Sequence, residues 1–413
     1  MKKIIILTLM LFTYSSYSQE MINEYTKDFE LGNGVNFSSN DNYFFKLSGM
    51  IQPSFSLEVS DKEFYYEDHV DYFFNSKRTF FSFSGYAKQE NVSFLVLTDF
   101  SLTTPLLDAW VAYSFTNSLK MTFGQKLTKS NNREMLLMED MLQFADRSIL
   151  STEFSQTGRE FGVFLDYKYK LHDFGFISSL SLTSGDGRSS FGSDSRDVDL
   201  GGFKYGGRID FYPLGFFKEG NENKVSDVMF ENDLKCVIGF AGSFNDGASN
   251  SVGEGHGDFY LWNLVRSPQL PDYRQVYADI LFKLKGASLL AEYVMTSASS
   301  LNQIYIDPLS ISLMAPGEIS NYLSLGNGLN TSLGYVFENG YSIDLRYSKV
   351  NPEYELNTSS VVQENSVISI AFAKYFVKDN FKLMTSFSQF NKGDNAYITT
   401  PKLMAELILQ LKI

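Results

Sequence analysis

The 413-residue sequence contains very little cysteine, histidine and tryptophan, with one, three and two residues respectively. The single cysteine, Cys236, cannot form a disulfide within the chain, so no covalent cross-link holds the fold. None of the histidines (His69, His172 and His256) stands near a patterned serine and aspartate, which leaves a hydrolase site weakly supported. We therefore expect no catalytic residue, no bound metal and no cofactor.

Long apolar runs are also scarce. Beyond the N-terminus, the sequence has no apolar stretch of the roughly 20 residues that a transmembrane helix requires. Two lysines precede the shorter apolar run Ile4 to Phe12, and the small residues of Ser16-Tyr17-Ser18 follow it. This pattern is typical of a signal peptide cleaved before Gln19, and no cysteine follows it to carry a lipid anchor. We expect residues 1–18 to be removed during export.

Positive charge is in deficit, with 35 lysines and arginines against 48 aspartates and glutamates, for a formal net charge of −13. Such a balance argues against nucleic acid as a partner, because nucleic acid selects basic surfaces. Aromatic residues, in contrast, make up 16% of the chain, while the mean hydropathy is only −0.15. This combination is expected of a transmembrane β-barrel, whose strands are apolar on one face only.

Apolar and polar residues alternate with a period of two over long segments, as they do in strands. In the segment 44–59, Phe45, Leu47, Ile51, Phe55, Leu57 and Val59 would face outward, with Lys46, Ser48, Gln52, Ser54, Ser56 and Glu58 inward. In 105–117, the outward set would be Leu107, Ala109, Val111, Tyr113 and Phe115. These segments exceed the usual strand length and match a tilted strand that crosses a membrane in about 9–11 residues.

The sequence predicts about sixteen antiparallel strands of an up-and-down transmembrane barrel. They lie near 44–59, 72–87, 91–102, 105–117, 119–127, 157–170, 173–185, 201–213, 232–246, 273–285, 287–298, 327–337, 340–350, 363–377, 380–390 and 402–413. A soluble β-sandwich or solenoid would also alternate, but its strands are shorter and its turn lengths need not segregate.

The connections alternate between long and short, which predicts long extracellular loops, short periplasmic turns and periplasmic termini. The long ones are 60–71, 128–156, 186–200, 247–272, 299–326, 351–362 and 391–401. Two exceptions are the short connection 102–104 and the long connection 214–231 on the turn side. We expect a periplasmic N-terminal segment at 19–43 and the barrel at 44–413.

Several short motifs carry a family resemblance along most of the chain. They are Phe45-Lys46-Leu47-Ser48-Gly49, Gln52-Pro53, Lys77-Arg78-Thr79, Leu107-Asp108-Ala109-Trp110-Val111, Phe123-Gly124-Gln125-Lys126, Thr183-Ser184-Gly185, Tyr205-Gly206-Gly207-Arg208 and Leu345-Arg346-Tyr347-Ser348. Their order and spacing resemble the phosphate-selective porin O and P family. The resemblance implies a sixteen-stranded channel, usually trimeric, whose third loop folds inward and whose arginines and lysines conduct phosphate or polyphosphate.

The third loop would be 128–156, with helix-like apolar spacing from Met135 to Phe144. The pore-lining candidates are its positive residues and five of the thirteen inward basic residues of the wall: Arg78, Lys126, Lys129, Arg133, Arg147, Lys204, Arg208 and Arg346. The loop departs from the family because acidic residues, among them Glu134 and Glu139, oppose its cations, and no bare arginine ladder is visible. Inward basic and acidic residues of the wall are roughly balanced, so a solvated wall residue paired across strands is the better interpretation of any single one.

Two functions remain open at this point. The first is a passive porin of the outer membrane for small hydrophilic solutes, with anions such as phosphate implied by the resemblance, as is a homotrimer surrounded by outer-membrane lipid. The second is a non-conducting barrel that acts as scaffold or partner of another envelope complex. Separately, the acidic loop 186–200 could bind a divalent cation or could simply be a flexible acidic loop, since it lacks ordered ligand spacing.

Overall fold

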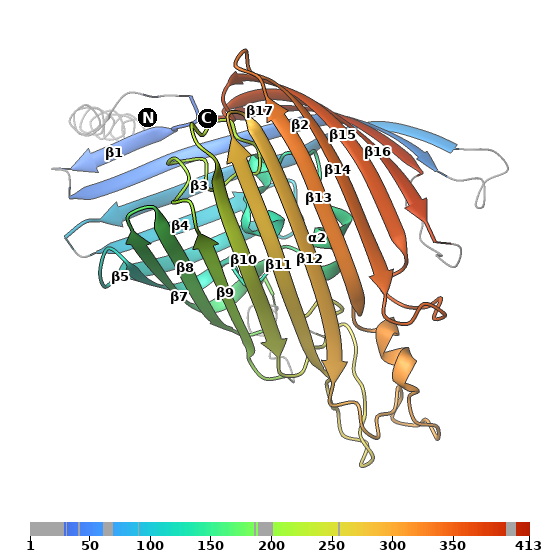
Figure 1. Ribbon diagram of the computed structural model, residues 1–413. Helices are drawn as coiled ribbons and strands as arrows, with labels where there is room; N and C mark the ends of the chain where they lie inside the picture. Colours follow the sequence, from blue (N-terminus) through green and yellow to red (C-terminus); the bar gives the residue numbers. More distant parts are fainter. Residues whose placement is uncertain are drawn as a thin grey trace, which may run out of the picture.

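The computed structural model describes residues 29, 31–39, 42–60, 69–89, 91–185, 187–188, 201–254, 257–393 and 402–413. The expected signal peptide and nearly all of the acidic loop 186–200 lie outside these residues. Sixteen antiparallel strands, β2 to β17, form a closed barrel in which each strand pairs with its neighbours in sequence (Figure 1). No helix in the described part of the chain is long and apolar enough to cross a membrane.

All sixteen predicted strands are confirmed. Their bounds are β2 Tyr43–Ser60, β3 His69–Ala87, β4 Val92–Asp99, β5 Leu106–Ser114, β6 Leu119–Leu127, β7 Arg159–Leu171, β8 Phe174–Thr183, β9 Lys204–Tyr212, β10 Lys235–Asn245, β11 Asp272–Leu284, β12 Ala287–Ser299, β13 Gly326–Val336, β14 Tyr341–Pro352, β15 Asn365–Val377, β16 Phe381–Lys392 and β17 Leu403–Lys412. His69, which falls in the predicted loop 60–71, is instead the first residue of β3.

The barrel closes between its first and last strands. β17 pairs with β2 from Leu403 opposite Val59 to Lys412 opposite Met50. A further strand that the sequence does not predict, β1 (Val35–Ser39), pairs with the remaining part of β2, Tyr43 to Leu47. Since β1 continues where β17 ends, the whole edge of β2 is hydrogen-bonded, as closure of a barrel in hydrocarbon requires.

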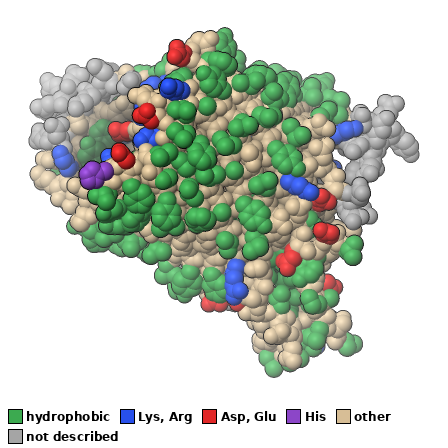
Figure 2. Space-filling model, viewed as in Figure 1, with side chains coloured by type: hydrophobic (Ala, Val, Ile, Leu, Met, Phe, Trp, Pro, Cys, Tyr) green, Lys and Arg blue, Asp and Glu red, His purple; other side chains and the backbone are tan. Residues whose placement is uncertain are grey.

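Apolar side chains cover the outside of the barrel, and Figure 2 shows one face on which few charged residues interrupt them. Along β14, the outward residues Tyr341, Ile343, Leu345 and Tyr347 are exposed, whereas the inward residues between them are buried. This alternation places an apolar surface against lipid and polar side chains in the lumen.

Two bulges change which residues face the lumen. Between β2 and β3, Gln52 pairs with Arg78 but Pro53 pairs with Ser76, so Lys77 has no partner and joins Arg78 on the inner face. Between β4 and β5, Leu97 pairs with Asp108 and Thr98 with Leu106. The prediction that Leu107 faces outward is therefore wrong, because an extra residue in a bulge breaks the alternation.

The two ends of the barrel differ as the connection lengths predict. The short turns, β1 and the C-terminal residue Ile413 lie at one end, which is periplasmic in outer-membrane barrels, and long connections lie at the other (Figure 1). The third loop, residues 128–158 and hereafter L3, folds into the lumen. Segment 213–234, the long connection at the periplasmic end, also has many buried residues.

Candidate functional site

L3 runs from the end of β6 to the start of β7 and contains three short helices. These are η1 (Glu134–Leu136), η2 (Glu139–Met141) and α2 (Ile149–Phe154). The helix-like spacing predicted over Met135 to Phe144 is realised only as two 3₁₀ turns, because Met138 and Leu142 adopt extended backbone angles between and after them. The continuous α-helical turn comes later in the loop.

Near its start, L3 is bound to the wall by a buried cluster of ions. Arg133 pairs with Asp210 of β9 and Asp279 of β11, with a distance of 2.6 Å from its Nε to Asp279 Oδ1. Arg208 of β9 pairs with the same two carboxylates, at 2.8 and 2.7 Å. Two positive and two negative groups are thus neutralised in one cluster, and none of them is left to act on a solute.

The next residue of L3 fastens the loop to the adjoining strands of the wall, β12 and β14. Glu134 donates its backbone N–H to Glu292 of β12 at 2.7 Å, and Arg346 of β14 lies 3.4 Å from the Glu134 carboxylate. Arg346 also donates to the backbone oxygen of Asp146 at 2.8 Å and lies over the ring of Phe144. This arginine therefore anchors two parts of L3 at once.

The middle of L3 reaches β3 and β17. Lys77 bridges Asp146 of the loop and Glu406 of β17, with both distances at 2.7 Å. Lys412, near the end of β17, pairs with Asp140 at 2.6 Å. L3 consequently makes charged contacts with the lumen wall from β9 round to β3, so it extends across the lumen and narrows it.

A glutamate of the fifth loop, residues 246–271, clamps the two ends of L3 together. One carboxylate oxygen of Glu254 accepts hydrogen bonds from the backbone N–H groups of Gln156, Thr157 and Gly158, at 2.8, 3.1 and 3.1 Å. Its other oxygen accepts from Asn131 at 3.4 Å. The closed form of L3 thus depends on a second loop.

Glu139 of L3 lies between two arginines. Arg159 approaches its carboxylate at 2.8 Å and Arg147 at 3.2 Å, while Arg159 also pairs with Asp108 of β5 at 3.3 Å. Burial alone would raise the pKa of Glu139, but the guanidinium groups of Arg159 and Arg147 outweigh that effect and hold its pKa well below the usual range. Glu139 therefore stays ionised at physiological pH.

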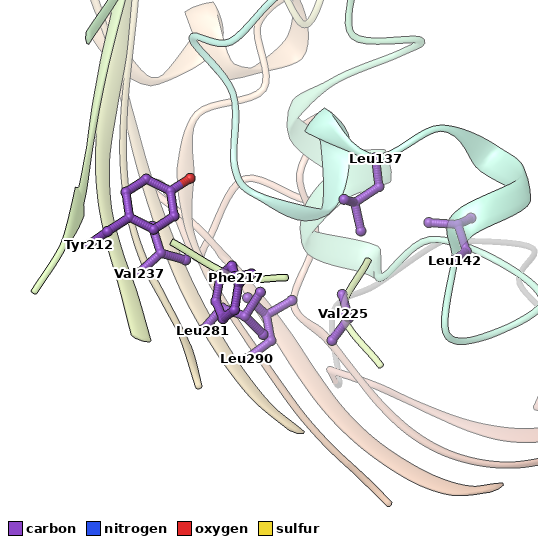
Figure 3. Close-up of a cluster of buried hydrophobic side chains, with 8 residues drawn as sticks. All are labelled: Leu137, Leu142, Tyr212, Phe217, Val225, Val237, Leu281 and Leu290. Carbon is purple, nitrogen blue, oxygen red and sulfur yellow. The ribbon is translucent and has the colours of Figure 1, made fainter. Parts of the chain in front are cut away.

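An apolar cluster joins L3, the wall and segment 213–234 (Figure 3). Leu137 and Leu142 come from L3, Val225 and Phe217 from segment 213–234, and Tyr212, Val237, Leu281 and Leu290 from the adjoining wall. Segment 213–234 is also fixed by an ion pair between Lys224 and Asp379, which lies in the turn after β15. Both L3 and segment 213–234 therefore fill the part of the lumen that lies next to β9 to β16.

The opposite side of the lumen keeps open space. A cavity of about 680 Å³, hereafter the vestibule, lies between L3, β4 to β9 and segment 213–234, at the periplasmic end. It is lined by Leu95, Asp108, Trp110, Lys120, Lys126, Leu127, Thr128, Lys129, Arg133, Leu136, Leu137, Met138, Met141, Asp166, Ile177, Asp210, Tyr212, Glu222 and Asn223. A smaller cavity of about 310 Å³ lies next to it and shares Leu95, Met138 and Met141.

Three of the eight predicted pore-lining residues border this open space, namely Lys126, Lys129 and Arg133. Lys126 lies 3.8 Å and Lys129 lies 2.8 Å from the carboxylate of Asp166. Arg133 lines the same cavity but is engaged in the buried ion cluster. Lys120, which the strand alternation of 119–127 places on the inner face but which is not one of the eight candidates, also lines the vestibule.

The other five candidates are held in packed contacts. Arg78 donates to Gln52 and to the backbone oxygen of Ala145, Arg147 pairs with Glu139, Lys204 pairs with Glu160, Arg208 joins Asp210 and Asp279, and Arg346 joins Glu134. These side chains fix loops to the wall. Lys77 also fixes L3 to the wall. The strand alternation does not predict this role, because Lys77 faces inward only as a result of the bulge.

Among the residues that the structure describes, no group of three or more histidine, cysteine, aspartate or glutamate side chains is placed to hold a metal ion. The acidic loop 186–200 falls largely outside those residues, so the choice between a cation site and a flexible acidic loop stays open.

No protein-family model matches the sequence, and no curated protein does either. Solved structures share its fold. The outer-membrane channel DcaP of Acinetobacter baumannii is 14% identical, with a TM-score of 0.54 over 91% of this chain and 99% of its own. OmpF of Salmonella typhi, solved with daunomycin, is 10% identical with a TM-score of 0.54 and the same coverage.

An anion-selective porin from Comamonas acidovorans is 9% identical, with a TM-score of 0.53 over 90% of this chain and 99% of its own. At such identities the similarity concerns the fold alone, and the resemblance to phosphate-selective porins stays a prediction. The chain has the fold of the outer-membrane porins.

Proposed function

We propose that this protein is an outer-membrane channel for small hydrophilic solutes, exported by its signal peptide, and that it prefers anions. The observation that carries the proposal is the vestibule, where Lys120, Lys126 and Lys129 surround the single carboxylate of Asp166. A sixteen-stranded barrel has room for water only where loops leave it, and this cavity adjoins the periplasmic mouth.

The anion preference follows from which charges remain available. Asp108 and Asp210, the other wall carboxylates of the vestibule, are already paired with arginines. Three ammonium groups against the carboxylates of Asp166 and Glu222 leave a net positive charge, which attracts anions by raising their local concentration. The resemblance implies phosphate as a candidate solute. However, the arginines that would form a phosphate-conducting ladder are engaged in the ion pairs that hold L3.

Planar bilayer recordings of the purified protein test this proposal. We expect stable single-channel steps in KCl, and a reversal potential in a KCl gradient that indicates chloride preference. Replacing all three lysines by glutamine should shift the reversal potential towards cations, whereas Lys374→Gln on β15, outside the vestibule, should leave it unchanged. Absence of steps would overturn the channel, and cation preference in the wild type would overturn the anion assignment.

We also infer that the barrel forms a homotrimer, as the resemblance implies. The edge of β3 that faces β4 supports this, because β4 pairs only with Phe80 to Ala87 and leaves Val70 to Ser76 without a described strand partner on that side. Tyr72 and Phe74 are 74% and 86% exposed there. Native mass spectrometry of detergent-solubilised protein should give a trimer mass that Phe74→Lys reduces to a monomer, and a monomeric wild type would exclude it.

A second candidate, a non-conducting barrel that serves as a scaffold, is favoured by the extent to which L3 and segment 213–234 fill the lumen. The bilayer recording separates the two. If the wild type shows no steps but variants that release L3 do, L3 closes the native barrel and the scaffold function is supported.

A further inference from the structure

The vestibule has two chemically different faces. On one face, Lys120 and Lys126 of β6 and Lys129 of L3 point to the cavity together with Asp166. On the other, L3 and the wall supply apolar side chains: Leu95, Leu136, Met138, Met141 and Ile177. Fully hydrated ions would gain no favourable contact from such an apolar face.

The positive face is preorganised. Asp166 is held by Ser179, which donates to it at 2.6 Å, and it binds Lys129 at 2.8 Å and Lys126 at 3.8 Å. Lys126 lies over the ring of Phe164, 5.2 Å from its centroid, which fixes its stem. With Lys120, three ammonium groups face the carboxylate of Asp166, and when Glu222 is counted as well the vestibule keeps one positive charge in excess.

Lys120 is the most available of these cations. Its ammonium group lies 5.2 Å from the ring centroid of Trp110, and no carboxylate of the described residues comes within ion-pair distance of it. Glu222, the vestibule carboxylate that belongs to segment 213–234, lies on the side of Tyr212. An anion beside Lys120 would thus meet an ammonium group and an indole ring together.

From these two faces we infer that the vestibule is a binding site for organic carboxylates with an apolar body, such as a ring or a short hydrocarbon. The carboxylate binds between Lys120 and Lys126, and the apolar body lies against Trp110 and the apolar side chains of L3. A volume of about 680 Å³ is in the range of sites for small molecules, which combine an apolar lining with a few placed charges. This inference rests on the proposed channel function and narrows its substrate class.

Trp110 and Trp262 are the two tryptophans of the chain, so Trp262→Phe leaves Trp110 as a fluorescent reporter inside the vestibule. Titration with cyclohexanecarboxylate should change its emission and saturate at millimolar concentrations, roughly the affinity of a small ligand held by one ion pair and one apolar contact. Inorganic phosphate and the neutral analogue cyclohexylmethanol should produce no saturable change over the same range.

Variants of each face complete the test. Lys120→Gln and Lys126→Gln should each weaken binding by about tenfold, and Leu136→Gln should weaken it while leaving the chloride preference intact. Lys374 is the matched control, since it also lies over an aromatic ring, 4.1 Å from the centroid of Tyr341, but on the other side of the barrel. Lys374→Gln should bind as the wild type does.

The outcomes distinguish this site from the channel itself. If the protein conducts but binds phosphate or cyclohexylmethanol as tightly as it binds cyclohexanecarboxylate, the carboxylate site is overturned and the channel function stands. Saturable carboxylate binding without conductance would overturn the channel and support the site. Loss of binding in Lys374→Gln as well would overturn the assignment, because the effect would then not depend on the vestibule.

Discussion

Arg133 of L3 and Asp279 of β11 form an ion pair of 2.6 Å in which the two side chains are 7% and 0% exposed. Removing two charges from water is costly, and the pair is stable only because Asp210 and Arg208 complete the cluster. A charge cluster of this kind fixes one position of a loop, since any displacement leaves a buried charge unpaired.

Replacing Arg133 by methionine should release the first anchor of L3. The loss of one member of a buried ion cluster costs about 3–5 kcal/mol, so urea unfolding of the folded barrel should move to lower concentrations. Single-channel conductance should rise, because L3 leaves the wall between β9 and β11. Lys349→Met, which breaks an exposed pair with Glu364, is the control and should change neither quantity. Unchanged conductance with reduced stability would show that L3 is held by its other contacts.

Glu254 should control how readily L3 opens, because it accepts three backbone N–H groups at the end of the loop. Glu254→Ala leaves these donors unsatisfied, at a cost of roughly 1–3 kcal/mol. We expect limited proteolysis to cut within 128–158 several times faster than in the wild type, while the barrel itself stays protected. The same cleavage rate in both proteins would contradict a clamp at Glu254.

Glu153 on α2 gives L3 a pH dependence of known sign. Burial raises the pKa of its carboxyl group to about 7. Because the folded state holds the proton more tightly than the unfolded chain, whose glutamate pKa is about 4.3, stability is present at low pH and is lost as pH rises between these two values. Glu153→Gln should therefore unfold at the same temperature as the wild type near pH 4 and at a higher temperature near pH 8. A larger gap at pH 4 than at pH 8 would contradict the burial of this group.

The strands were predictable from sequence because each repeats one rule, apolar outward and polar inward, over its whole length. The positions of Leu107 and Lys77 were not, because one inserted residue reverses the rule locally. Pro53, which pairs with Ser76 next to Lys77, is a sequence signal of the bulge in β3. The roles of Arg133 and Arg208 also escaped prediction. The strand alternation directs Arg208 inward and the fold of L3 directs Arg133 inward, but their shared partner Asp279 lies 71 and 146 residues away from them in sequence.

Segment 213–234 offers a last test, since a connection of this length at the periplasmic end is itself unexpected. Lys224 joins it to Asp379 in the turn after β15, and Val225 packs against Leu137 and Leu142 of L3. Burial alone would raise the pKa of Asp379, but Lys382, Lys224 and Lys412 outweigh it and lower that pKa, so the carboxylate is charged at neutral pH.

Lys224→Met removes the charge that crosses the periplasmic mouth and keeps most of the side-chain volume. We expect the segment to leave the mouth more often, with greater conductance and more frequent open-channel fluctuations in bilayers. Lys170→Met, at the exposed end of β7, is the matched control. Asp379→Asn should reproduce the effect of Lys224→Met, and the double variant should add little to either, because both changes break one interaction. Additive effects would mean that Lys224 and Asp379 act separately, and that segment 213–234 is held in place by its apolar contacts with L3.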